Sequence, residues 1–155
     1  MSSLDKTALP AVEYLLEASP DELFAELELR RLSIAEQPRT AGSFDAASQY
    51  RAVVNLPVAQ LTEFGRRFFA RFSRDLHDLV CGSDLANAEV RKDLQSSLTS
   101  KSTFAAAVAG VLVFHFGIAP ALAAVVAALV VRLFVDNALH VLCEMWGESL
   151  SKATA

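Results

Sequence analysis

Cysteine is scarce in this chain, which has 155 residues and only Cys81 and Cys143. Two cysteines are too few for the disulfide frameworks that hold small secreted domains together. The N-terminal segment Met1–Pro10 contains Asp5 and Lys6 and has no apolar core region, so it does not have the pattern of a secretory signal. Together these observations predict a cytoplasmic protein in a reducing compartment.

Positive charge is also in short supply. Lysine and arginine number 14 against 18 aspartates and glutamates, which gives a formal net charge of −4. A chain with this balance is not built as a whole to bind nucleic acid. The positive charge is nevertheless concentrated, because Arg66, Arg67, Arg71 and Arg74 form a local cluster, whereas acidic residues dominate the segment 5–28.

The alternating pattern of β-strands is missing from the whole sequence. Apolar side chains recur instead three and four residues apart, which places them on one face of a helix. A length of 155 residues suits one domain, and hydrophobic residues make up 53% of it. The sequence therefore predicts an all-α fold, a single-domain bundle of about five or six helices. Its clearest apolar stripe comprises Leu61, Phe64, Phe68, Phe72, Leu76 and Leu79.

Local signals divide this domain into four parts. Ser19-Pro20-Asp21-Glu22 has the pattern of a capping box and predicts a helix start at Pro20. Pro38 and Gly42 predict a break, and Pro57 predicts the start of a helix that runs to Val80 and ends at Gly82. We expect one domain over 1–155, with acidic N-terminal helices at 1–36, a loop at 37–49, Phe/Arg-rich and polar helices at 50–98, and a hydrophobic hairpin at 102–150.

The expected hairpin is the most apolar part of the chain, because Thr103–Val131 contains no Asp, Glu, Lys or Arg. Gly117 suits the end of one helix and Pro120 the start of the next. The first limb, from about Ser102 to Phe116, would be roughly 21 Å long, whereas a bilayer core is about 30 Å thick. We therefore expect the two limbs, the second running from Pro120 to about Leu150, to form the buried centre of the bundle.

Membrane contact is the alternative interpretation of this hairpin. Its alanine, valine and glycine content and its Gly117–Pro120 turn resemble the buried hydrophobic hairpins of colicin-type pore-forming domains. The resemblance implies a membrane-active protein, such as a small toxin or defence effector, that sheathes its hairpin in amphipathic helices until it is released.

The arginine cluster is the first candidate site. Arg67, Arg71 and Arg74 share one face of the predicted helix, and Phe68 and Phe72 lie mostly on the other side. Such a face suits an anionic membrane surface or an acidic protein partner. The alternative is a solvated flank, partly neutralised by two local ion pairs, Arg71 with Asp75 and Arg74 with Asp78.

The histidines and cysteines form the second candidate site. His77 and Cys81 lie four residues apart near the end of one predicted helix, and His140 and Cys143 lie three apart on another. Two histidines and two cysteines can close a tetrahedral zinc site if the helix ends meet. Buried cysteines that act as small hydrophobic residues are the favoured interpretation. A disulfide is the third alternative, and the expected reducing compartment argues against it.

Two further side chains are singled out by their surroundings. His115 is the only titratable group between Thr103 and Val131, and we expect a buried histidine bonded to a backbone carbonyl. Trp146 ends an apolar patch, either as an anchor of the core or as the centre of an interface.

No constellation of catalytic residues accompanies these candidates. Asp136 is placed to orient His140, but no nucleophile completes the set. We therefore expect a protein that is not an enzyme, with no cofactor. The leading hypothesis is a helical interaction module that binds itself or another chain. A membrane-active protein is its rival, and a metal-binding bundle is the weakest alternative.

Overall fold

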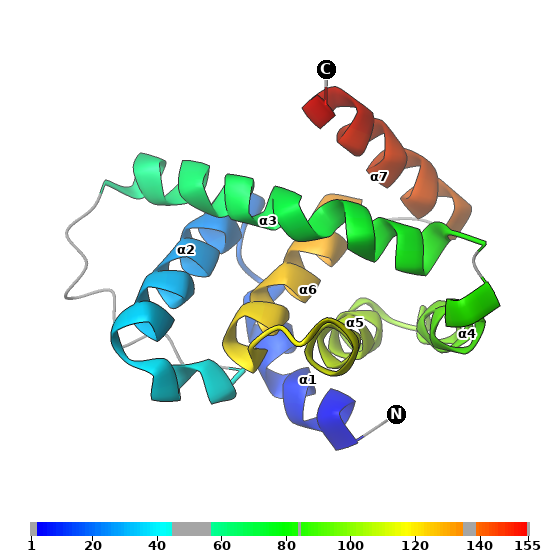
Figure 1. Cartoon of the computed structure of the whole chain (residues 1–155), viewed down its shortest axis with the longest axis horizontal. Coiled ribbons are helices and arrows are strands. Elements are labelled where there is room, and N and C mark those ends of the chain that lie inside the picture. Colours follow the sequence, from blue (N-terminus) through cyan, green and yellow to red (C-terminus); the bar gives the residue numbers. More distant parts are fainter. Residues whose placement is uncertain (1–2, 45–56, 84, 135–138, 155) are drawn as a thin grey trace.

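The computed structural model describes residues 3–44, 57–83, 85–134 and 139–154 (Figure 1). Within these ranges the chain forms seven α-helices and no strand, which confirms the all-α prediction and exceeds the expected number of helices. The helices are α1 (Ser3–Leu15), α2 (Pro20–Glu36), α3 (Val58–Cys81), α4 (Ala88–Ser96), α5 (Lys101–Phe116), α6 (Pro120–Phe134) and α7 (Leu139–Thr154), with short 3-10 helices η1 (Pro38–Gly42) and η2 (Leu85–Asn87).

Helix α6 occupies the centre of the bundle. From Ala123 to Val131 no residue is more than 1% exposed to solvent. Figure 1 shows α6 in the middle of the molecule, and α1, α2 and α5 pack against it. A helix that is apolar on every side has to be enclosed in this way. Ala124 and Val126 are both fully buried, as a central helix requires.

The expected second limb, 120–150, is not one helix. Helix α6 ends at Phe134 and α7 begins at Leu139, and Figure 1 shows that α7 takes another direction and lies beside α3. A straight helix of that length would extend about 45 Å and would leave the bundle. Helix α7 also exposes Glu144 and Glu148, so it suits the surface. Residues Asp136 and Asn137 lie outside the described residues.

The predicted helix ends are confirmed where their signals are local. The Ser19 side chain accepts a hydrogen bond from the Glu22 amide, and the Glu22 side chain accepts one from the Ser19 amide. Gly117 adopts a left-handed φ of 67° after α5, a conformation that favours glycine. Gly82 ends α3 as expected, but in extended conformation with its amide bonded to the Asp78 carbonyl.

Other boundaries differ from the expected ones. Part of the loop expected at 37–49 is the short 3-10 helix η1, and the residues from 45 to 56 lie outside the described ranges. The polar helix expected up to Leu98 is shorter, since η2 precedes α4 and α4 ends at Ser96.

The buried face of α3 is rotated from the expected stripe. Phe69 is 6% exposed, whereas Phe64 is 37% exposed and Phe68 and Phe72 are half-buried. The rotation follows from Gly65, because a Cβ there would lie 1.8 Å from the backbone oxygen of Phe24 in α2. The absence of a side chain at Gly65 lets the two helices approach closely and turns the adjacent face of α3 inward.

A buried arginine of α2, paired within that helix, links it to the start of α6. The Arg30 Nε donates to Glu26 Oε1 at 3.1 Å, and both side chains are less than a tenth exposed. The Arg30 Nη1 also donates to the carbonyl oxygens of Ala121 at 2.8 Å and Phe44 at 2.5 Å. The guanidinium therefore exchanges its water for several protein acceptors, as a buried charge requires.

Candidate functional site

The arginines of α3 separate into two pairs. Arg66 Nη1 and Nη2 lie 3.3 Å from the carboxylates of Glu63 and Asp21, and Arg67 Nε lies 3.1 Å from Glu63. The Arg66 guanidinium also lies 5.2 Å from the centre of the Phe24 ring. Arg66 therefore ties α3 to the start of α2, whereas Arg67 pairs only within α3.

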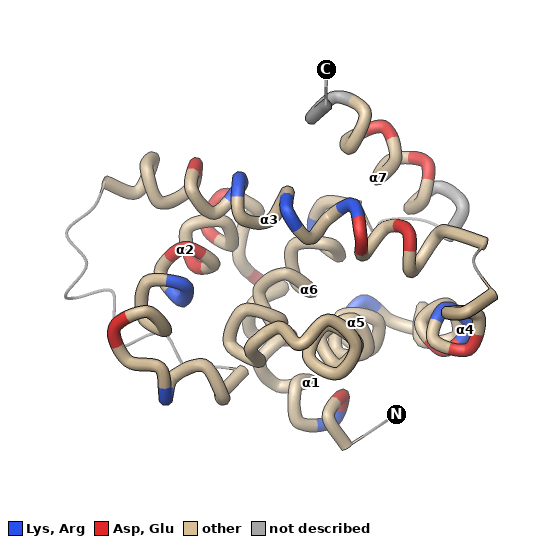
Figure 2. Tube along the Cα trace, viewed as in Figure 1, with Lys and Arg blue, Asp and Glu red and all other residues tan. Residues whose placement is uncertain are grey.

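Arg71 and Arg74 remain exposed, and neither makes an ion pair within the described part of the chain. The expected local pairs with Asp75 and Asp78 are not formed. Exposed pairs of this kind contribute only about 0.3–0.5 kcal/mol, too little to hold two long side chains in one geometry. Figure 2 shows basic positions along α3, followed by acidic positions toward the C-terminal end of the helix.

The phenylalanines assigned to the same site point elsewhere. Phe68 and Phe72 form an edge-to-face pair with ring centres 5.0 Å apart, and both pack against the main core. Phe68 and Phe72 therefore anchor α3 to the core. All four arginines of this candidate site are exposed, and Arg71 and Arg74 are the two that make no ion pair within the described residues.

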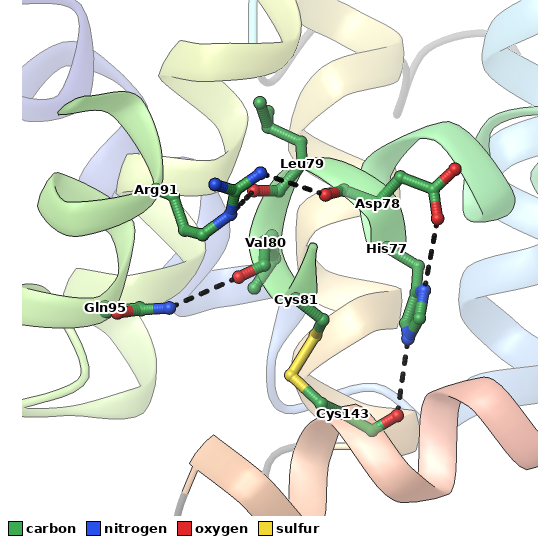
Figure 3. Close-up of a disulfide and its surroundings, with 8 residues drawn as sticks. All are labelled: His77, Asp78, Leu79, Val80, Cys81, Arg91, Gln95 and Cys143. Atoms are coloured by element: carbon green, nitrogen blue, oxygen red, sulfur yellow. Dashed lines mark hydrogen bonds and ion pairs between the residues drawn. A yellow bond between two sulfur atoms is a disulfide. The ribbon is translucent and has the colours of Figure 1, made fainter. Parts of the chain in front are cut away.

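The cysteines do meet, and they bind each other. Cys81, at the end of α3, and Cys143, in α7, form a disulfide with 5.7 Å between their Cα atoms (Figure 3). Neither sulfur is then a thiolate that can hold zinc. His77 Nε2 lies 3.3 Å from the Cys143 carbonyl oxygen, and the His140 side chain lies outside the described residues. The described ranges contain no cluster of three His, Cys, Asp or Glu suited to a metal ion.

Trp146 anchors α7 beside this disulfide. Its side chain is fully buried, and its ring stacks on Phe134 with 5.2 Å between ring centres and 12° between planes. The indole Nε1 donates to Ser73 Oγ at 2.8 Å, and the His77 ring packs edge-on at 5.3 Å. Of the two roles left open for Trp146, the structure supports the anchor of the core.

The α3 terminus is held from its other side by α4. Arg91 Nε donates to the Leu79 carbonyl at 2.9 Å, and Gln95 donates to the Val80 carbonyl at 3.4 Å (Figure 3). Arg91 and Gln95 thus satisfy carbonyls that a helix end leaves without partners. The C-terminal end of α3, which carries Cys81, is therefore held by α4 as well as by the disulfide to α7.

A surface groove between α1, α4 and α5 was not anticipated from the sequence. Its volume is about 760 Å³. Its apolar lining includes the strip Ala107, Val111 and Phe114 of α5, and polar side chains such as Asp5 and Asp93 also line it. Phe114 is 88% exposed at the rim. The strip escapes sequence analysis because α5 is apolar on every side, so no pattern separates its open face from its buried one.

Two polar contacts shape this groove. A Cβ at Gly110 would lie 2.1 Å from the Asp5 carboxylate, so the absence of a side chain there makes room for α1. His115 is exposed rather than buried, and its Nε2 lies 3.1 Å from Asn87 Oδ1. The expectation of a core histidine is wrong because α5 ends at the surface, where His115 bonds a side chain of η2.

One exposed arginine has a shifted proton affinity. Hydrogen bonds to the buried Glu28 carboxylate raise the pKa of Arg31, against the lowering effect of partial burial. Arg31 is therefore permanently charged, and it pairs with Glu28 within α2.

Comparison of the chain with family models, with curated proteins and with solved structures finds no match. Among the described residues, none of the helices has both the length and the apolarity needed to cross a bilayer.

Proposed function

We propose that this protein is a non-enzymatic helical interaction module that associates with a second copy of itself through the groove between α1, α4 and α5. The observation that carries this proposal is Phe114, an aromatic side chain that is 88% exposed at the rim of an apolar groove. A large aromatic residue gains by entering a pocket and leaving water, which is why such residues dominate interfaces.

The groove suits a symmetric contact because it carries both an exposed aromatic side chain and an apolar hollow that can receive one. Phe114 projects from the end of α5, and Ala107 and Val111, earlier on the same helix, line the hollow. A two-fold axis beside α5 brings the Phe114 of each copy to the hollow of the other, and such a self-complementary patch is what a two-fold dimer requires. Because α6 is buried, this strip of α5 supplies exposed apolar surface for assembly in its place.

The test is the mass of the protein in solution as a function of concentration, by sedimentation equilibrium. We expect a concentration-dependent dimer for the wild type. Replacement of an interface hot spot costs about 2 kcal/mol or more, so Phe114→Glu weakens association by roughly 30-fold or more. Tyr14→Glu is the matched control, since Tyr14 is 79% exposed on α1 outside the groove. A wild type that stays monomeric at every concentration refutes the proposal.

A membrane-active protein is the second candidate. It is favoured by the apolar and enclosed segment of α6 from Ala123 to Val131, together with Arg71 and Arg74 exposed without ion pairs within the described residues. Exposed arginines attract anionic lipid, and an enclosed apolar helix supplies the surface to insert after release. Binding of the monomer to anionic vesicles distinguishes this candidate from self-association.

A further inference from the structure

Helix α7 is attached to the bundle at few points. It packs against α3 and α6. Leu142 and Trp146 are its fully buried anchors, whereas Glu144, Met145 and Glu148 face solvent. Among the described side chains of α7, full burial is thus confined to these two anchors, which lie beside the bond between Cys81 and Cys143, and the partly buried Leu150 adds a contact with the core.

The disulfide is accessible from solution. Cys81 and Cys143 are both only partly buried, at the edge where α7 meets the end of α3. Exchange of a disulfide requires that a thiolate reach one sulfur from outside, so exposure decides whether a bond is exchangeable. Arg91 and Gln95 hold the Cys81 end of α3 independently of α7, so that end keeps its place if the bond is broken.

We infer that the Cys81–Cys143 disulfide is reduced reversibly by thiol–disulfide exchange with a dithiol, and that its reduction releases α7 from the bundle. A thiolate of the dithiol attacks one cysteine sulfur, forming a mixed disulfide and expelling the other cysteine as a thiolate, which takes up a proton. The second thiol of the dithiol then attacks the mixed disulfide and frees the remaining cysteine. Two electrons and two protons pass to the cysteines, and the dithiol becomes a disulfide.

Release changes the surface of the bundle at a defined place. The bond keeps α7 at a high effective concentration next to its seat, so its loss raises the fraction of molecules in which α7 is undocked. The stacked face of Phe134 and the Ser73 hydroxyl then lose Trp146 and meet water. This inference is independent of self-association through Phe114, because the groove is built from α1, α4 and α5.

The experiment uses the only tryptophan in the sequence as its reporter. Trp146 emission and the hydrogen exchange of α7 amides are measured on the oxidised wild type, on the same protein equilibrated with dithiothreitol, and on Cys81→Ser/Cys143→Ser. We expect a red shift of the emission on reduction, and an acceleration of exchange in α7 that exceeds any acceleration in α5 and α6 by roughly tenfold or more. Reoxidation should restore both signals.

The controls distinguish a disulfide that holds only α7 from one that stabilises the whole fold. The double serine variant should resemble the reduced wild type and should not respond to dithiothreitol, while oxidised Trp146→Phe should have no tryptophan signal. Unchanged protection of α7 in the reduced protein overturns the inference. So does an equal loss of protection in every helix, because the bond then stabilises the whole fold. Two free thiols in protein prepared without reductant also overturn it.

Discussion

Helices α6 and α7 are neighbours in the sequence and are held in opposite ways. Helix α6 is enclosed along most of its length, and nine consecutive residues from Ala123 to Val131 are at most 1% exposed. Helix α7 is held by a disulfide to α3 and by side chains of which, among the described ones, only Leu142 and Trp146 are fully buried. The position of α6 therefore depends on composition, which cannot be changed without loss of the fold, whereas the position of α7 depends on a bond that chemistry can open.

The largest effect is expected from a charge in α6. Ala124→Asp places a carboxylate at a fully buried position, where an uncompensated charge costs about 3–5 kcal/mol or more. We expect loss of soluble, folded protein, measured by soluble yield and circular dichroism. The matched change in α7 is Ser149→Asp at an exposed position, which should shift stability by less than about 0.5 kcal/mol. A soluble and fully helical Ala124→Asp protein would falsify the central placement of α6.

The disulfide is expected to have the next largest effect. It joins residues separated by 62 positions, and loop-closure entropy for such a separation stabilises the oxidised fold by about 4 kcal/mol. The Cys81→Ser/Cys143→Ser variant should lose that amount in guanidinium unfolding, compared with the oxidised wild type. Since fully reduced wild type lacks the same bond, its curve should fall close to that of the variant, and a large gap between the two would assign the loss to the serines instead.

What could be predicted from the sequence follows the same division. The capping box at Ser19, the turn at Gly117 and the apolar composition of α6 are local features, and each is confirmed. The disulfide depends on whether the ends of two distant helices meet, and spacing alone left it as one of three alternatives. The close approach at Gly65 also rests on a partner helix, so the apolar stripe of α3 was placed one position away from Phe69.

The functional candidates divide in the same way. The exposure of Arg71 and Arg74 was anticipated, because charged residues on the outer face of an amphipathic helix meet water. The groove at Phe114 was not, since three helices from separate parts of the chain form it. A sequence pattern indicates which side chains are apolar and favour burial. Only the packing of the helices determines which of them stay exposed.

A smaller effect is expected at the hydrogen bond beneath α7. Ser73→Ala removes the acceptor of the Trp146 indole N–H, and a buried donor without a partner costs about 1–3 kcal/mol. Unfolding measurements on the oxidised protein should show this loss. Ser73→Thr is the matched control, because it keeps a hydroxyl at the same position. The same loss in a Trp146→Phe background, where no indole N–H exists, would show that the hydrogen bond is not the cause.

The smallest effect on stability is expected at the exposed arginines of α3. Arg71→Gln/Arg74→Gln removes two charges that make no ion pair within the described residues, so the free energy of unfolding should change by less than about 0.5 kcal/mol.

Binding to anionic vesicles provides the sharper measurement. Each basic residue contributes about 1 kcal/mol at such a surface, so the double variant should bind roughly 30-fold more weakly if lipid is the partner. Arg66→Gln/Arg67→Gln is the matched comparison, because it removes the same net charge from arginines that are paired with Glu63 and Asp21, so a smaller loss of binding in it would assign the lipid contact to Arg71 and Arg74. If reduction also strengthens vesicle binding by the wild type, release of α7 and membrane activity are parts of one process. If neither variant nor reduction changes vesicle binding, the exposed arginines are a solvated flank and the groove at Phe114 remains the surface to pursue.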